Sequence, residues 1–155
     1  MASRVVVALR VQASPERAFQ VFTEEIGLWW KPSAFFAFTP RSPGEMAFEA
    51  DAAGRRLVER LANGKVFEVG RVSVWEPPSR LVVGWRQATF TPEQTTEVEV
   101  RFEAVGDQTR ITVTHTGWDS VPGEHVAKHG FPEVLFMRRH GEWWQALLAA
   151  LEARL

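Results

Sequence analysis

The sequence of 155 residues contains no cysteine and no tyrosine. The absence of cysteine excludes a disulfide framework and a thiol nucleophile. No apolar run reaches the roughly 18 residues of a membrane-spanning helix, and the opening MASRVVVALRVQ lacks the apolar core of a signal peptide. The net charge of −1 gives no long-range attraction to nucleic acid or to an anionic membrane. We therefore expect a cytoplasmic protein that binds neither.

The motifs of several enzyme classes are also missing. There is no G-x-S-x-G nucleophile turn, no glycine-rich phosphate loop and no H-E-x-x-H zinc motif. The carboxylates Glu97 and Glu99 alternate with apolar residues, which places them on the wet face of a strand. The sequence therefore assigns no catalytic residue and no cofactor.

One histidine pair has a spacing that suits a metal. His125 and His129 lie four residues apart, which on a helix places two imidazoles on one face, where His140 or Glu133 could complete a zinc site. The prolines and glycines around this segment oppose a helix there. A solvated loop is the simpler interpretation, and no metal is predicted.

What the chain does have is a large aromatic content in a globular composition. Hydrophobic residues make up 45% and charged residues 24%, with seven tryptophans and eleven phenylalanines. This composition, and a length typical of one domain, predict a single domain over residues 1–155. Because a buried indole N–H needs a partner, seven tryptophans favour a wide, partly polar interior.

The N-terminal region predicts one strand and two helices. RVVVALRV at 4–11 is rich in β-branched residues, as strands are. Ser14, followed by Pro15, is typical of a helix N-terminus, and a second short helix from Glu24 to Trp30 precedes Pro32. The second helix carries the doublet Trp29-Trp30, of which one ring is expected in the core and the other at a pocket mouth.

Residues 43–117 predict six antiparallel strands separated by turn signals. Asn63-Gly64 is the strongest signal, because both residues tolerate the positive φ of a two-residue hairpin. TEVEVRF and RITVTHT alternate clearly, and their pairing places His115 on the same inner face as Val113 and Ile111. A lone histidine there is expected to be hydrogen-bonded and structural.

The C-terminal region from Pro132 to Arg154 predicts one long helix. At 100° per residue, one face carries Glu133, Met137, His140, Gly141, Trp144, Leu147, Leu148, Leu151 and Leu155. The aliphatic half of this face is core. The half with His140 and Glu133 favours a water-containing cavity, because unpaired charge is costly in an apolar interior; a helix that begins after Glu133 is the alternative.

Four segments together resemble a known family. AFQVFTEEIGLWWKP, the run from Gly70 to Trp85, TRITVTH at 109–115 and GEWWQALLAAL at 141–151 occur in the order found in the START-like (SRPBCC) superfamily. The most similar branch is the bacterial proteins related to the activator of the 90-kDa heat-shock protein ATPase. The resemblance implies an α+β helix-grip fold: a seven-stranded curved antiparallel sheet around a long C-terminal helix, in the order β-α-α-β6-α.

The resemblance also implies a cavity between sheet and helix. We expect it to bind a hydrophobic or aromatic small molecule through Trp29, Trp30, Phe35, Phe36, Trp85, His115, Trp118, Glu133, Met137, His140 and Trp144. Two alternatives stay open. One is a polyketide-cyclase-like enzyme with His115 or His140 as general acid or base, and the other is a chaperone-activator-like module that binds a protein partner. A homodimer is equally open.

Overall fold

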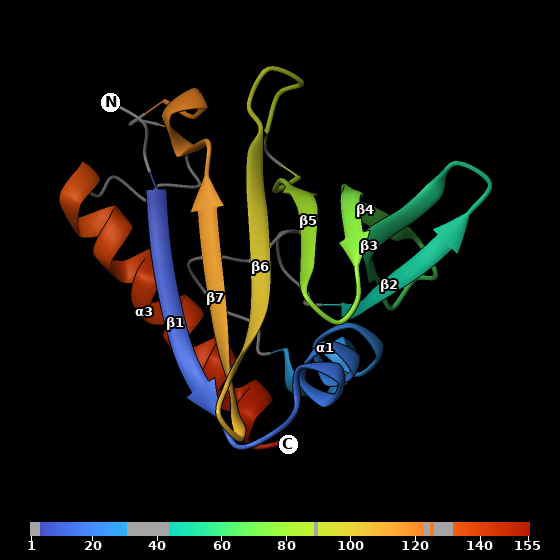
Figure 1. Cartoon of the computed structure of the whole chain (residues 1–155). Coiled ribbons are helices and arrows are strands. Elements are labelled where there is room, and N and C mark those ends of the chain that lie inside the picture. The colour runs from blue at the N-terminus through green and yellow to red at the C-terminus, as the bar shows by residue number, and fades with distance from the viewer. Residues whose placement is uncertain (1–3, 31–43, 89, 123–124, 126–131) are drawn as a thin grey trace.

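Seven strands form one antiparallel sheet in the order β1-β7-β6-β5-β4-β3-β2. The computed structural model describes residues 4–30, 44–88, 90–122, 125 and 132–155. Its elements follow the chain as β1 (Arg4–Val11), α1 (Pro15–Glu24), α2 (Ile26–Trp29), β2 (Glu45–Asp51), β3 (Gly54–Arg60), β4 (Val66–Glu76), β5 (Arg80–Trp85), β6 (Thr96–Val105), β7 (Gln108–Thr116), the short 3₁₀ turn η1 (Trp118–Ser120) and α3 (Glu133–Glu152). The α+β helix-grip order predicted from the sequence is confirmed (Figure 1).

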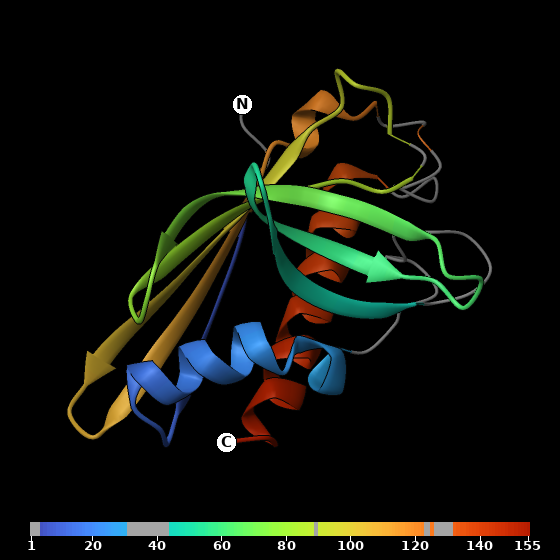
Figure 2. The ribbon, with the colours of Figure 1, turned by 90° about the vertical axis from the view of Figure 1, so that its right-hand side faces the viewer.

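The helices cover one side of the curved sheet. α3 packs against β1, and α1 packs against β6 and β2 (Figure 2). α1 passes near the C-terminal end of α3, so the sheet and the two helices enclose the core from different directions. The predicted seven-stranded sheet around a C-terminal helix is therefore what the chain forms.

The start of α1 follows from its first residues. Ser14 is the N-cap, and its Oγ accepts a hydrogen bond from the Arg17 backbone N–H at 3.2 Å. Pro15 occupies the first turn, where the missing N–H costs nothing. The predicted second helix is shorter than expected: α1 continues to Glu24, and α2 holds only Ile26–Trp29.

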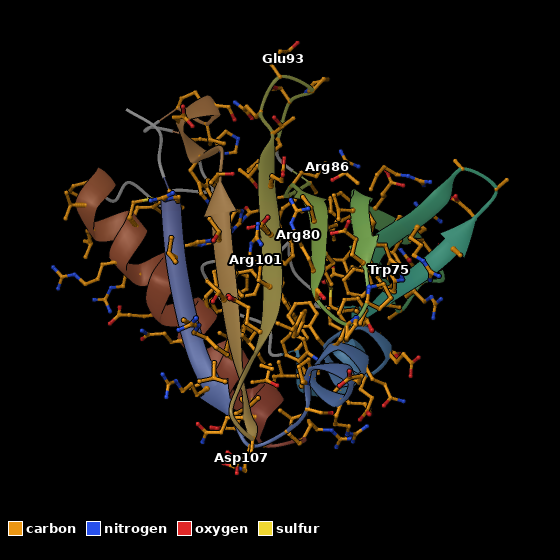
Figure 3. All side chains as sticks on the ribbon, in the orientation of Figure 1. Trp75, Arg80, Arg86, Glu93, Arg101 and Asp107 are labelled. Atoms are coloured by element: carbon orange, nitrogen blue, oxygen red, sulfur yellow. The ribbon has the colours of Figure 1, made fainter. Side chains whose placement is uncertain are left out.

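The β6–β7 hairpin has the predicted faces. Val98 pairs with His115, Val100 with Val113 and Phe102 with Ile111, and all six side chains are buried. On the opposite face, Glu99 accepts a hydrogen bond from Arg80 at 2.7 Å, so the alternating charges form cross-strand pairs (Figure 3). The wet and dry faces thus follow from the period-2 pattern alone.

The Asn63-Gly64 turn differs from the prediction. Residues 61–65 separate β3 from β4, so the loop is longer than two residues. The Leu61 N–H donates to the Lys65 carbonyl at 2.8 Å, the Gly64 N–H donates to the Leu61 carbonyl at 3.0 Å, and Gly64 has φ of +85°. A turn followed by a left-handed glycine closes longer hairpins, and glycine supplies that conformation without steric cost.

The core draws on every main element. One cluster of buried apolar side chains includes residues from all seven strands and from α1, α2 and α3. A smaller cluster of Phe90, Trp118, Val121 and Phe136 lies beside it, and Met137 and Trp143 contact both. Within the residues described, no helix is long and apolar enough to cross a membrane.

Candidate functional site

His115 and His140 meet in the interior. β7 directs His115 inward, α3 directs His140 towards it, and both side chains are 0% exposed. Nε2 of His140 lies 2.8 Å from Nδ1 of His115. The Trp144 indole N–H also donates to His115 Nδ1, at 3.3 Å, one helical turn further along α3.

Thr96 determines which nitrogens carry hydrogen. β5 and β6 pair Trp85 with Thr96, and the Thr96 hydroxyl donates to the Trp85 carbonyl at 2.5 Å. Because a hydroxyl has one hydrogen to donate, Thr96 Oγ1 must accept the 2.9 Å bond from His115 Nε2–H. Nδ1 of neutral His115 then carries no hydrogen, and it accepts hydrogen bonds from both His140 Nε2–H and Trp144 Nε1–H.

Burial keeps both imidazoles neutral. Desolvation lowers the pKa of His115 well below its usual value, and the neighbouring His140 lowers it further. Desolvation alone lowers the pKa of His140 to about 3. At neutral pH the pair is therefore an uncharged hydrogen-bonded network, which is the structural role expected for His115.

Aromatic rings surround this network. Trp85 lies 5.7 Å from His115 and 5.4 Å from Trp144, measured between ring centroids. Trp118 lies 5.3 Å from His115 and 5.1 Å from His140. Offset and edge-to-face contacts at these distances are favourable, so these described rings pack on one another.

The two rings of the tryptophan doublet differ in burial, with Trp29 in the core and Trp30 half-buried. Trp29 is 2% exposed, and its indole N–H donates to the Val21 carbonyl at 3.0 Å. Trp30 is half-buried, with its ring 5.5 Å from Trp85 and from Trp143 and 5.9 Å from Trp144. Trp30 and Trp143 thus form the outer margin of the aromatic cluster.

The structure brings together much of the predicted residue set. Trp30, Trp85, His115, Trp118, His140 and Trp144 contact one another, and half-buried Met137 packs beside them. The Trp29 ring lies 5.6 Å from the Trp30 ring, measured between centroids. Phe35, Phe36 and the Glu133 side chain lie outside the described residues.

The sequence pattern missed three members of the cluster. Phe136 is fully buried and stacks on His140 at 5.7 Å, and Trp143 lies 5.4 Å from the same ring. Thr96 fixes the His115 tautomer. Phe136 was within reach of the sequence, because it lies four residues before His140. Thr96 was not, because its role depends on the register between β5 and β6.

A hollow lies elsewhere on the molecule, beside α1. It has a volume of about 480 Å³ and is lined by Glu16, Phe19, Gln20, Thr23, Glu24, Phe48, Arg55, Trp75, Pro77 and Pro78. Trp75 lies near the end of β4 that approaches α1 (Figure 3). Its ring contacts Phe19 at 5.3 Å and Phe48 at 6.0 Å, and the Arg55 guanidinium lies over it at 4.3 Å. The prediction named none of these residues as ligand contacts.

Aromatic side chains connect the hollow to the histidine cluster. Phe22 lies 6.5 Å from Phe48 and 5.1 Å from Trp29, and Trp29 lies 5.6 Å from Trp30. The hollow and the cluster are therefore two ends of one aromatic interior.

The histidine pair considered for metal binding is only partly described. His125 lies with its ring 5.5 Å from Phe90 and nearly perpendicular to it, and His129 is outside the described residues. No group of three or more metal-ligating side chains occurs among the residues that the structure describes.

The sequence was compared with protein-family profiles. The profile of the family described as "Activator of Hsp90 ATPase homolog 1-like protein" matches residues 12–155. The chain belongs to this family. The START-like resemblance inferred from the four segments is thereby confirmed. A search of curated protein sequences returned no significant match.

Solved structures support the same fold for this family member. Protein MLL2253 from Mesorhizobium loti superposes with a TM-score of 0.63 at 18% identity, over 97% of this chain and 94% of that one. PFC0360w, an HSP90 activator from Plasmodium falciparum, superposes with a TM-score of 0.61 at 19% identity, over 97% of this chain and 94% of that one. The anthrahydroquino-gamma-pyrone synthase Txn09 superposes with a TM-score of 0.56 at 26% identity, over 95% of this chain and 96% of that one. These proteins differ in described role, so the shared fold does not determine function, which has to be argued from the residues of the site.

Proposed function

We propose that this chain binds a hydrophobic or aromatic small molecule on the helix-covered side of its sheet, and that the ligand sits in the hollow beside α1. The observation that carries the proposal is the hollow itself. Its volume of about 480 Å³ falls within the range of small-molecule sites, about 300–1,000 Å³. The space predicted between the sheet and α3 holds tryptophan and histidine rings in mutual contact, which a ligand there would have to separate.

The lining suits a planar ligand with one hydrogen-bond-accepting group, and because two glutamates line the hollow beside one arginine, a neutral acceptor is favoured over an anion. Phe19, Phe48 and Trp75 provide apolar and aromatic faces. Arg55 places a cation over Trp75, where it can donate a hydrogen bond to a phenolic oxygen. The Thr23 hydroxyl already donates to the Phe19 carbonyl at 2.9 Å, so Arg55 is the better candidate for orienting the ligand.

A thermal-shift screen with fatty acids, sterols and flavonoids tests the proposal, followed by calorimetric titration of each hit. We expect a stabilising ligand among the flavonoids, which are planar and carry phenolic oxygens. Arg55→Ala and Trp75→Ala should weaken its binding at least tenfold, whereas Trp30→Leu, in the other part of the interior, should leave it unchanged. Loss of ligand binding in Trp30→Leu alone would place the site in the α3 cluster. If the panel contained no ligand that stabilises the protein, that result would count against the proposal.

A polyketide-cyclase-like enzyme is the second candidate. The observation that favours it is the 26% identity to Txn09 over nearly the whole chain. The buried His115–His140 pair would supply the acid or base, but both nitrogens of His115 are already engaged by protein groups. Proton transfer to a ligand would have to replace one of these bonds. Turnover that disappears in His140→Gln, with the fold and ligand binding intact, would establish this role.

A protein-binding role is the third candidate, and membership of the Hsp90-activator-like family favours it. Such a role would use the surface of the molecule instead of the hollow. Stimulation of a chaperone ATPase by the purified chain, retained in Arg55→Ala and Trp75→Ala, would separate it from the small-molecule proposal.

A further inference from the structure

One edge of the sheet is formed by β1. β1 pairs with β7 on one side, and among the described residues no strand pairs with its other side. In an edge strand, alternate residues direct backbone N–H and C=O groups away from the sheet, and these groups can pair with another chain. The eight residues of β1 therefore offer a row of donors and acceptors.

A groove runs along this edge, between β1 and α3. It has a volume of about 380 Å³ and is lined by residues 4–7 of β1 and by Met137, Arg138, Gly141, Glu142 and Gln145 of α3. α3 lies beside β1 and extends past it (Figure 1). α3 comes close to β1 at Gly141, where a Cβ would lie 3.7 Å from Val5 Cγ1, an ordinary van der Waals contact. A strand edge with a helix beside it has the geometry of sites where an extended peptide adds to a sheet.

The charge around the groove is positive. Arg4 and Arg138 line it, both are exposed, and neither forms an ion pair within the described part of the chain. Glu142, the acidic residue of the lining, lies 3.5 Å from Arg139. Further along β1, exposed Arg10 adds a third cation opposite Arg110. The protein as a whole carries −1, so this edge differs in sign from the average surface.

The same charges disfavour one register of pairing with a second copy of the chain. Antiparallel self-pairing of residues 4–10 places Arg4 opposite Arg10 twice, and like charges directly opposite destabilise a sheet. An acidic segment meets no such repulsion.

We propose that β1 and α3 form a strand-addition site for an extended, acidic segment of a protein partner. The segment pairs with the edge of β1 that no described strand occupies, its inward side chains pack on α3, and its carboxylates lie near Arg4, Arg138 and Arg10. This site is separate from the hollow beside α1, so either proposal can fail without the other.

A labelled peptide tests the site directly. The probe is a fluorescein-labelled eight-residue peptide of alternating valine and glutamate, matched in length to β1, with its binding followed by anisotropy. We expect saturable binding that weakens with salt, with NMR shifts confined to residues 4–11 of β1 and 137–145 of α3. A peptide of alternating valine and lysine, and a glutamate peptide with proline at alternate positions, should not bind.

Charge-reversal variants assign the contact. Arg4→Glu/Arg138→Glu should weaken binding of the glutamate peptide at least tenfold, because both side chains are exposed and outside the core. Lys65→Glu, in the exposed β3–β4 turn, makes the same kind of charge change away from the groove and should bind like the wild type. Circular dichroism confirms that each variant is folded.

Four outcomes would overturn the proposal, of which three come from the peptide experiments. They are the absence of binding by the valine–glutamate peptide, equal binding by the double variant, and NMR shifts outside β1 and α3. A dimer in sedimentation experiments that masks the β1 amides from hydrogen exchange would also overturn it, since the occupant would then be a second copy.

Discussion

Thr96 is the smallest side chain in the buried network, yet it fixes the positions of the hydrogens. Its single hydroxyl hydrogen is used by the Trp85 carbonyl, so His115 must donate from Nε2 and accept at Nδ1. His140 and Trp144 then each direct an N–H to one acceptor. Two buried donors therefore depend on a single nitrogen atom of His115.

This dependence predicts unequal costs for the two histidines. His115→Leu leaves the Trp144 and His140 donors without their acceptor, at about 1–3 kcal/mol each, so we expect a loss of about 2–6 kcal/mol in the free energy of unfolding. His140→Leu should cost less, because Trp144 still donates to His115 Nδ1. Urea denaturation of both variants measures the difference, and an equal or reversed order would contradict the assigned tautomers.

The same pair predicts a loss of stability in mild acid. Well above pH 6.5 both histidines are neutral in the folded and unfolded chains, so there they add no pH dependence to the free energy of unfolding. Folding lowers the pKa of both histidines, that of His140 to about 3. Below pH 6.5 the two imidazoles are therefore protonated in the unfolded chain but remain neutral in the folded chain.

We therefore expect the free energy of unfolding to fall as the pH falls from 6.5, by up to about 1.4 kcal/mol per pH unit for each histidine. Urea titrations at pH 7.5, 6.0 and 5.0 measure this above the range where most carboxylates titrate. His140→Leu should halve the slope. A flat profile in the wild type between pH 6.5 and 5 would show that the pair is not buried and neutral.

At the scale of elements, β4 and β5 approach closely at two glycines. A Cβ on Gly70 would lie 1.7 Å from the Gly84 carbonyl oxygen, in the backbone of the neighbouring strand. A Cβ on Gly84 would meet nothing closer than the Arg71 N at 3.7 Å, an ordinary contact. The two strands therefore depend on one glycine and tolerate a side chain at the other.

Alanine substitutions make this asymmetry testable. Gly70→Ala should destabilise the protein by at least about 2–3 kcal/mol, because backbone must move to admit the methyl group. Gly84→Ala is the matched control and should change stability by less than about 1 kcal/mol. Thermal unfolding by circular dichroism compares them, and a tolerated Gly70→Ala would mean that the strands lie further apart.

At the scale of the molecule, the main apolar cluster joins every strand to all three α-helices. The smaller cluster around Trp118 is connected to it through Met137 and Trp143. Every strand and α-helix that the structure describes contributes buried residues to this core, so local unfolding of one element removes contacts from the others.

Cooperative unfolding follows from this arrangement. We expect urea unfolding curves from tryptophan fluorescence and from far-ultraviolet circular dichroism to coincide, as in two-state domains of about this size. Trp29, Trp85, Trp118 and Trp144 are all buried, so fluorescence reports on both clusters. An earlier fluorescence transition without loss of secondary structure would indicate that the Trp118 cluster unfolds separately.

Much of the architecture was determined by the sequence itself. The alternation of Val98, Val100 and Phe102 fixes the inner face of β6, and Ser14-Pro15 fixes the start of α1, because these signals act through neighbours in the chain. The family motifs gave the order of elements and the helix-grip arrangement. The face of α3 was largely predictable from its helical period, apart from Phe136.

Only the tertiary structure decided the chemistry of the interior. Thr96 contacts His115 because of the register in which β6 pairs with β5 and with β7. The close approach of the Gly70 and Gly84 backbones likewise depends on how β4 pairs with β5. The hollow beside α1 joins residues from α1, β2, β3 and β4 that are far apart in sequence. A local pattern determines which way a side chain points, because it depends on backbone periodicity; what that side chain meets depends on long-range packing, which no local pattern contains.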